Sequence, residues 1–260
     1  MKSTNRSTFR SIWIQIFFVA AIPLLAFLGT EALNLLNLFQ ETAIVRDMET
    51  NIPLFAATST AIDRLQKERG TTALAASGQA APALLAEVRA ATDTALQTLA
   101  AALPKAALGK FSIAPFTEVP RRVSELRSQA AASSLETVST VIDGYSAVIE
   151  DLLKLQSAVV NARTTKGLGI VLGGLAVLET AKESAGQLRA LGARILAASS
   201  PVAPKDFNKF LTLKGDMDGG INSPALMLSE NGRRKLKTEL PASAHWERTD
   251  SMLTTIIQQA

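Results

Sequence analysis

The order of hydrophobic and polar positions predicts helices along most of the chain. Apolar residues recur at helical spacing in segments that glycine, proline, serine and asparagine interrupt. No run alternates apolar and polar residues in the way that a half-buried strand does. The predicted fold class is therefore all-α, with helices over residues 32–76, 80–103, 117–133, 135–163, 168–198, 204–213 and 229–259.

The N-terminal segment has a different pattern, because residues 11–30 carry no charge. About 20 apolar residues in a helix are long enough to cross the hydrocarbon core of a membrane. Lys2, Arg6 and Arg10 precede this run and Glu31 follows it. Positive residues before a span favour retention of that end in the cytoplasm. The sequence therefore predicts a single membrane anchor with a cytoplasmic N-terminus.

These features divide the chain into a cytoplasmic segment over 1–10, a transmembrane helix over 11–31 and a helical domain over 41–260. The domain is expected in the periplasm, on the outer side of a bacterial inner membrane. A cleaved signal peptide is the alternative interpretation of the same segment. The apolar run is long for that role, however, and no small-x-small cleavage site precedes Asn34.

Composition argues against several functional classes. The chain has no cysteine, which excludes disulfides, thiolate zinc sites and a cysteine nucleophile. Its net charge of +4 is scattered, so we expect no nucleic-acid partner. His245 is the single histidine and has no second metal-ligand residue spaced with it. The sequence therefore predicts no catalytic residue, no metal site and no cofactor.

Two arginines fall on helix faces that are otherwise apolar. In helical projection Arg69 lies inside the apolar stripe of residues 54–73. Lys182 and Arg189 lie on the apolar face that we predict for residues 168–196. Removing a guanidinium from water costs several kcal/mol, so a buried arginine requires an anionic partner.

That partner has two candidate sources. Glu68 and Glu183 would form internal ion pairs, each with an arginine of the other helix. Alternatively, the two guanidinium groups converge on a small oxyanion, because their paired N–H donors match planar, carboxylate-like oxygens. In that case Gly186, nearly one turn before Arg189, would let a neighbouring helix or the ligand approach closely.

Two sequence segments around these arginines resemble a known family. LQKERG at 65–70 and AKESAGQLRA at 181–190 are similar to the two signature segments of the nitrate- and nitrite-sensing family, the NIT domains. Tyr145 and Trp246 stand where the family has further characteristic residues. The resemblance covers roughly residues 45–260. The sequence departs from it at Leu188, where the family more often has glutamate before the arginine.

The resemblance implies two stacked four-helix bundles that hold the anion between them. Such domains are found on chemoreceptors, sensor kinases, cyclases and antiterminators. Transferred by motif, the ligand-binding residues are Arg69 and Arg189. The residues expected to support them are Glu68, Gly70, Lys182, Glu183 and Gly186.

The sequence thus predicts a sensor for nitrate or nitrite rather than an enzyme. It would be a homodimer in the lipid bilayer and part of a chemoreceptor or sensor kinase. No output domain follows up to Ala260, so we expect either a longer chain or a separate signalling partner. A helical dimerisation module without ligand, with Arg69 and Arg189 in structural ion pairs, is the alternative. A small carboxylate is a further candidate ligand.

Overall fold

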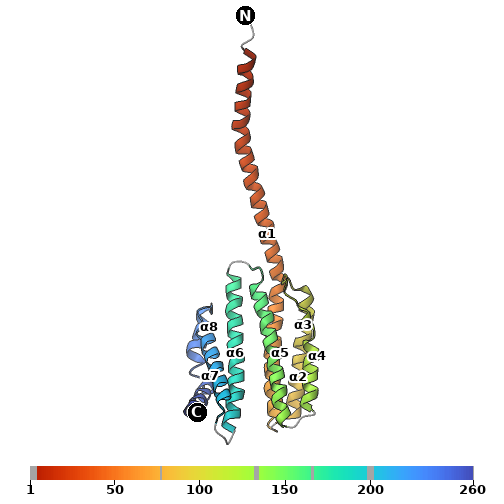
Figure 1. Ribbon diagram of the computed structural model, residues 1–260, viewed down its shortest axis with the longest axis vertical. Helices are drawn as coiled ribbons and strands as arrows, with labels where there is room; N and C mark the ends of the chain where they lie inside the picture. Colours follow the sequence, from red (N-terminus) through yellow and green to blue (C-terminus); the bar gives the residue numbers. More distant parts are fainter. Residues whose placement is uncertain (1–4, 77, 132–134, 165–166, 198–201, 260) are drawn as a thin grey trace. The chain divides into compact units, whose positions relative to one another are not determined.

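The computed structural model describes residues 5–259 except 77, 132–134, 165–166 and 198–201. These residues form helices and no strand, which confirms the all-α prediction. The chain divides into two compact units, Met1–Arg46 and Asp47–Ala260. The helices, labelled in Figure 1 where there is room, are α1 (Asn5–Ala76), α2 (Pro82–Ala102), α3 (Ala114–Thr117), α4 (Val119–Ala131), α5 (Leu135–Asn161), α6 (Leu168–Ala197), α7 (Pro204–Ile221), α8 (Glu230–Arg234) and α9 (Ala244–Gln259), with short 3-10 and π turns at Leu103–Lys105 and Lys235–Glu239.

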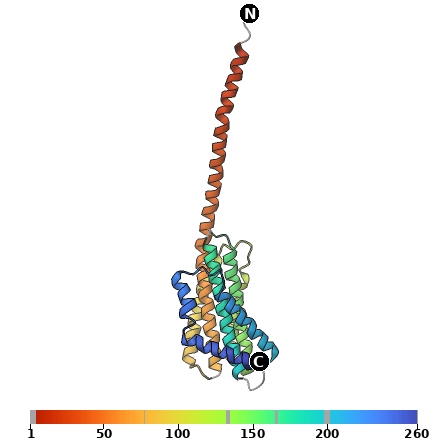
Figure 2. The same cartoon turned by 90° about the vertical axis from the view of Figure 1, so that its left-hand side faces the viewer.

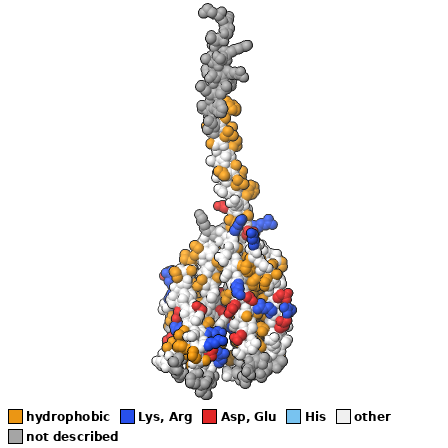
Figure 3. Space-filling model, viewed as in Figure 1, with side chains coloured by type: hydrophobic (Ala, Val, Ile, Leu, Met, Phe, Trp, Pro, Cys, Tyr) orange, Lys and Arg blue, Asp and Glu red, His pale blue; other side chains and the backbone are white. Residues whose placement is uncertain are grey.

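The N-terminal unit consists of the first part of α1. Among the residues that the structure describes, no helix is both long enough and apolar enough to cross a membrane. The transmembrane helix predicted over 11–31 falls on a stretch whose side chains are described only in part, and it stays a prediction. Several large apolar side chains of this unit are exposed (Figure 3), namely Leu24, Leu25, Phe27, Leu28, Leu33, Leu35, Leu36, Leu38 and Phe39.

The second unit contains two hydrophobic cores. The first draws buried side chains mainly from α1, α2, α4 and α5, with Leu54, Ile62 and Leu65 of α1 fully buried in it. The second joins α6, α7 and α9 through residues such as Leu188 and Phe210. Figure 2 shows α9, at the blue end of the colour bar, lying across the neighbouring helices rather than along them. Two stacked four-helix bundles stay a prediction.

Helix α6 takes part in both cores and therefore links them. Leu172, near its beginning, packs in the first core, whereas Leu188, Leu191 and Ile195 pack in the second. The stripe predicted on α1 is confirmed from Leu54 to Thr72. A helix that contacts one core on one side needs one apolar stripe, but α6 contacts two cores and needs more than one.

The C-terminal helices differ from their predicted bounds. The helix predicted over 229–259 is interrupted, and α9 begins only at Ala244. Pro241 lies in the interruption, and the hydroxyl of Ser243 accepts a hydrogen bond from the backbone N–H of Trp246 at 3.3 Å. Proline lacks a backbone N–H and a serine side chain satisfies free N–H groups at a helix start, so both favour the break.

The helix predicted over 204–213 is also too short, because α7 continues to Ile221 through Gly219 and Gly220. A Cβ added at Gly220 would lie 2.5 Å from the Cβ of Ala181 on α6. This glycine therefore permits close packing of two helices and does not end one. In the sequence a glycine pair is typical of a helix break, and the packing partner that explains this one is distant in the chain.

We expect Gly220→Ala to lower the free energy of unfolding by about 1–3 kcal/mol, because α6 and α7 must move apart. The neighbouring Gly219 is a matched control, since a Cβ there meets nothing within 4 Å. Gly219→Ala should raise stability by up to about 1 kcal/mol through helix propensity alone. Urea denaturation followed by circular dichroism measures both variants. Equal shifts in the same direction would contradict the packing role.

Candidate functional site

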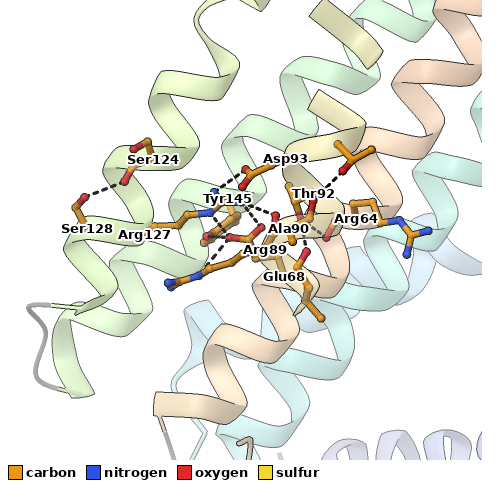
Figure 4. A network of polar contacts seen from close by, with 12 residues as sticks. Arg64, Glu68, Arg89, Ala90, Thr92, Asp93, Ser124, Arg127, Ser128 and Tyr145 are labelled. Atoms are coloured by element: carbon orange, nitrogen blue, oxygen red, sulfur yellow. Dashed lines mark hydrogen bonds and ion pairs between the residues drawn. The ribbon is translucent and has the colours of Figure 1, made fainter. Parts of the chain in front are cut away.

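Glu68 and Arg69 are adjacent on α1 and therefore point about 100° apart. The side chain of Glu68 is fully buried beside α2, α4 and α5. Arg127 of α4 donates to both of its oxygens, from Nε to Oε1 at 2.7 Å and from Nη2 to Oε2 at 2.9 Å. The Tyr145 hydroxyl of α5 donates to Oε1 at 2.7 Å (Figure 4). Glu68 thus joins helices of the first core.

Neighbouring charges determine the ionisation of this group. Burial alone would raise the pKa of Glu68, but hydrogen bonds from Arg127 and Tyr145 and the positive charge of Arg127 outweigh it and lower the pKa below its ordinary value. Burial and the charge of Glu68 raise the pKa of the Tyr145 hydroxyl. Arg127 also donates to Asp93 at 2.7 Å. Glu68 is therefore ionised at neutral pH while the Tyr145 hydroxyl keeps its proton, and Arg127 compensates the charge of the Glu68 carboxylate inside the protein.

Arg127 is a site residue that the sequence prediction missed. It follows Val119 and Val123 at intervals of four on α4, and both valines are buried. That spacing puts a cation on an apolar face, which is the same signal that identified Arg69 on α1. The same spacing argument, applied to α4, would have identified Arg127 as a partner for Glu68 in place of Arg189.

Arg69 points to a second network between α1, α5 and α6. Its Nη1 lies 2.5 Å from Oε1 of Glu183 and its Nη2 lies 3.2 Å from Oε2, so the pair is bidentate. Nη1 also donates to the Ser146 hydroxyl at 2.8 Å. Gln66 and Gln187 donate to the Glu183 carboxylate at 2.9 and 2.8 Å. Arg69 and Glu183 are 6% and 3% exposed, so this is a buried ion pair with its oxygens well satisfied.

The guanidinium of Arg69 lies directly against the backbone of α6. A Cβ added at Gly186 would be 2.9 Å from Nη2 of Arg69. Gly186 therefore permits the kind of close approach for which it was singled out in the sequence. Gly70 differs, since a Cβ there meets nothing within 4 Å. Close packing therefore does not require a glycine at position 70.

The prediction of which side of α6 is buried is wrong. Arg189 and Lys182 are exposed, and so are Val171 and Leu175, which share their side of the helix in projection. Lys182 pairs with Asp63 of α1 at 3.0 Å, and Arg189 has no ion pair with any residue that the structure describes. The buried face lies further round the helix and contains Leu172, Ala181, Ser184, Leu188, Leu191 and Ile195.

Contacts along α1 and α6 nevertheless bring the two arginines to neighbouring levels. Asp63 contacts Lys182, Gln66 contacts Glu183 and Arg69 lies against Gly186. Residue numbers rise together on the two helices, so they run parallel with a nearly constant offset. One turn after Arg69 and Gly186, this register brings Arg189 level with Thr72. The two arginines therefore lie about one helical turn, or about 5 Å, apart along the helix contact, one inside and one at the surface.

The groups of this arrangement are of the kind that recognise planar anions. A buried guanidinium fork already holds two carboxylate oxygens, and an exposed cation without an ion pair among the described residues lies one turn away. Carboxylate, nitrate and nitrite all present two oxygens in a plane to such a fork. The Arg69 fork therefore has the chemistry of carboxylate recognition, and the Glu183 carboxylate occupies it.

Comparison with known proteins agrees with the position of these motifs. The chain matches the family model described as nitrate and nitrite sensing over residues 60–260, well over half of its length. Neither a curated protein nor a solved structure matches it. The matched region contains both arginine segments, and the family is one of sensing domains rather than of enzymes. The chain therefore belongs to the nitrate- and nitrite-sensing family.

Proposed function

We propose that this domain binds nitrate or nitrite between α1 and α6, with Arg69 and Arg189 as the ligand-binding residues. The observation that carries this proposal is the bidentate pair of Arg69 with the Glu183 carboxylate. Glu183 offers the same planar pair of oxygens as the anion, at a fork whose geometry selects such groups. The bound anion takes the place of Glu183 on Arg69, and Arg189 turns inward from the surface to meet it.

This exchange provides a mechanism for signalling. The Arg69–Glu183 pair joins α1 to α6, and α6 in turn contributes to both cores. An anion that replaces Glu183 therefore changes how α6 is held against α1. A ligand shifts such an equilibrium only by its difference in affinity for the two states. Here the difference comes from the exchange of an internal carboxylate for an external anion.

A membrane anchor at the N-terminal part of α1 belongs to the same proposal. Exposed leucine and phenylalanine side chains between Leu24 and Phe39 support it, because a lipid bilayer would cover apolar surface of this kind. The domain would then lie in the periplasm as the sensing part of a homodimeric chemoreceptor or sensor kinase. The charges before residue 11 support this orientation.

Calorimetric titration of the full chain in detergent micelles with nitrate, nitrite, acetate and chloride tests the proposal. The informative variant is Arg189→Gln, because Arg189 is exposed and its removal leaves the buried networks intact. We expect it to weaken nitrate or nitrite binding about tenfold or more, as the loss of a charge-assisted hydrogen bond does. Arg194→Gln removes another exposed arginine of α6, which pairs with Asp206, and should bind like the wild type.

A second function is favoured by the completeness of the Arg69 network. Glu183, Gln66, Gln187 and Ser146 already satisfy the buried charges. Under this alternative the pair is structural and the domain is a helical interaction module. Absence of binding heat from a folded wild-type chain, together with a crosslinked dimer indifferent to anions, would establish this alternative and exclude the sensor.

A further inference from the structure

Thr72 is a buried polar residue with no hydrogen-bond partner among the described residues. It lies on α1 one turn after Arg69 and is 4% exposed. Its hydroxyl oxygen is fully buried and makes no hydrogen bond to any described group. A buried hydroxyl without a partner costs free energy, so a state of the protein in which a ligand satisfies the Thr72 hydroxyl gains that free energy back.

Two further threonines of the described chain are equally buried, and both are satisfied within their own helix. The Thr58 hydroxyl donates to the carbonyl oxygen of Leu54 at 2.8 Å. The Thr92 hydroxyl donates to that of Val88 at 3.1 Å. A helical threonine can therefore bond to the preceding turn in this protein, but Thr72 does not. Thr58 is consequently a matched control for Thr72 on the same helix.

The register of α1 and α6 places Thr72 beside the anion site. Gln66 contacts Glu183 and Arg69 lies against Gly186, so the next turn of α1 lies level with Arg189. Thr72 is the residue of α1 at that level. The Thr72 hydroxyl is thus one helical turn from the Arg69 guanidinium on α1. It is level with the exposed Arg189 guanidinium on α6.

We propose that Thr72 is a third ligand-binding residue and makes the site selective for nitrate. This inference rests on the proposed function of the site. A guanidinium fork binds two oxygens of a planar anion, and nitrate has a third oxygen that the fork leaves free. The Thr72 hydroxyl donates a hydrogen bond to that oxygen. Nitrite has no third oxygen, and acetate has a methyl group there, so neither gains this bond.

Calorimetric titration of the full chain in detergent with sodium nitrate and sodium acetate tests the role of Thr72. Thr72→Val removes the hydroxyl at nearly constant shape and should weaken nitrate binding about tenfold, with acetate binding unchanged. Thr72→Ser keeps the hydroxyl and should bind nitrate within about twofold of the wild type, as should Thr58→Val.

A measurement without anion separates this role from a structural one. Thr72→Val should unfold at a temperature no lower than the wild type, because it loses no hydrogen bond, whereas Thr58→Val loses one. Nitrate binding by Thr72→Val equal to that of the wild type would overturn the inference and leave the arginine site standing. A wild-type chain that binds no anion would overturn the proposed function and this inference together.

Discussion

Replacing Glu183 by glutamine is expected to lower the free energy of unfolding by about 3–5 kcal/mol and to make the remaining stability depend on nitrate. The substitution leaves Arg69 buried without a counter-ion, and breaking a buried ion pair from one side has this cost. It also removes the internal competitor for the guanidinium. Nitrate at about a hundredfold excess over its dissociation constant should then return about 2.7 kcal/mol.

Urea denaturation in equal concentrations of sodium nitrate and sodium chloride measures both effects. Glu179→Gln is the matched control on the same helix. Oε2 of Glu179 has no hydrogen-bond partner in the described part of the chain and only a long ion pair with Lys182 at 3.7 Å. Burial outweighs that pair and raises the pKa of Glu179, so its charge does not stabilise the fold. That variant should be as stable as the wild type and indifferent to nitrate. A Glu183→Gln chain of wild-type stability would show that the pair with Arg69 is dispensable.

Replacing Arg127 by methionine should have an effect of similar size but without any response to nitrate. It leaves the fully buried Glu68 with Tyr145 as hydrogen-bond donor and Arg89 at 3.8 Å as the nearest cation. We expect a loss of about 3–5 kcal/mol at neutral pH, because a buried carboxylate then lacks its bidentate partner. Arg121→Met on the same helix removes an exposed arginine and should stay close to the wild type.

The pH dependence of stability tests whether Glu68 is the group that Arg127 stabilises. The folded-state pKa of Glu68 is lowered, so its contribution to stability is present above the ordinary pKa of about 4.3 and is lost as the pH falls through the lower folded value. The stability difference between the wild type and Arg127→Met should therefore shrink as the pH falls from neutral to acidic values, because protonation of Glu68 removes the charge that Arg127 compensates. Denaturation at both neutral and acidic pH measures it. A difference that is constant with pH would show that Glu68 is not the group involved.

Side-chain spacing within one helix predicted some of the site correctly. The apolar stripe of α1 identified Arg69 as a buried cation, and the residue is 6% exposed. A buried arginine needs an anionic partner, and the two candidates for Arg69 were an internal glutamate, Glu183, and a small oxyanion. These inferences succeed because the angle between residues of one helix depends only on helix geometry.

The same reasoning failed for α6 because the helix has apolar residues on more than one side. Periodicity gives the angles between residues, but it does not give the rotation of a helix about its axis against its neighbours. Contacts with both cores turn Leu172 and Leu188 inward and leave Arg189 exposed. The glycines of α7 show a related limit, since the close approach of Gly220 to Ala181 depends on a distant helix.

The sequence by itself determined that the chain is all-helical, that Arg69 is buried with an anionic partner, and that its motifs are those of the nitrate- and nitrite-sensing family. Only the tertiary structure decided which partners meet. Glu68 and Arg69 are neighbours in the chain, yet one pairs with Arg127 and the other with Glu183. The reason is that adjacent helical residues point about 100° apart, so the helices packed on each side select the partners.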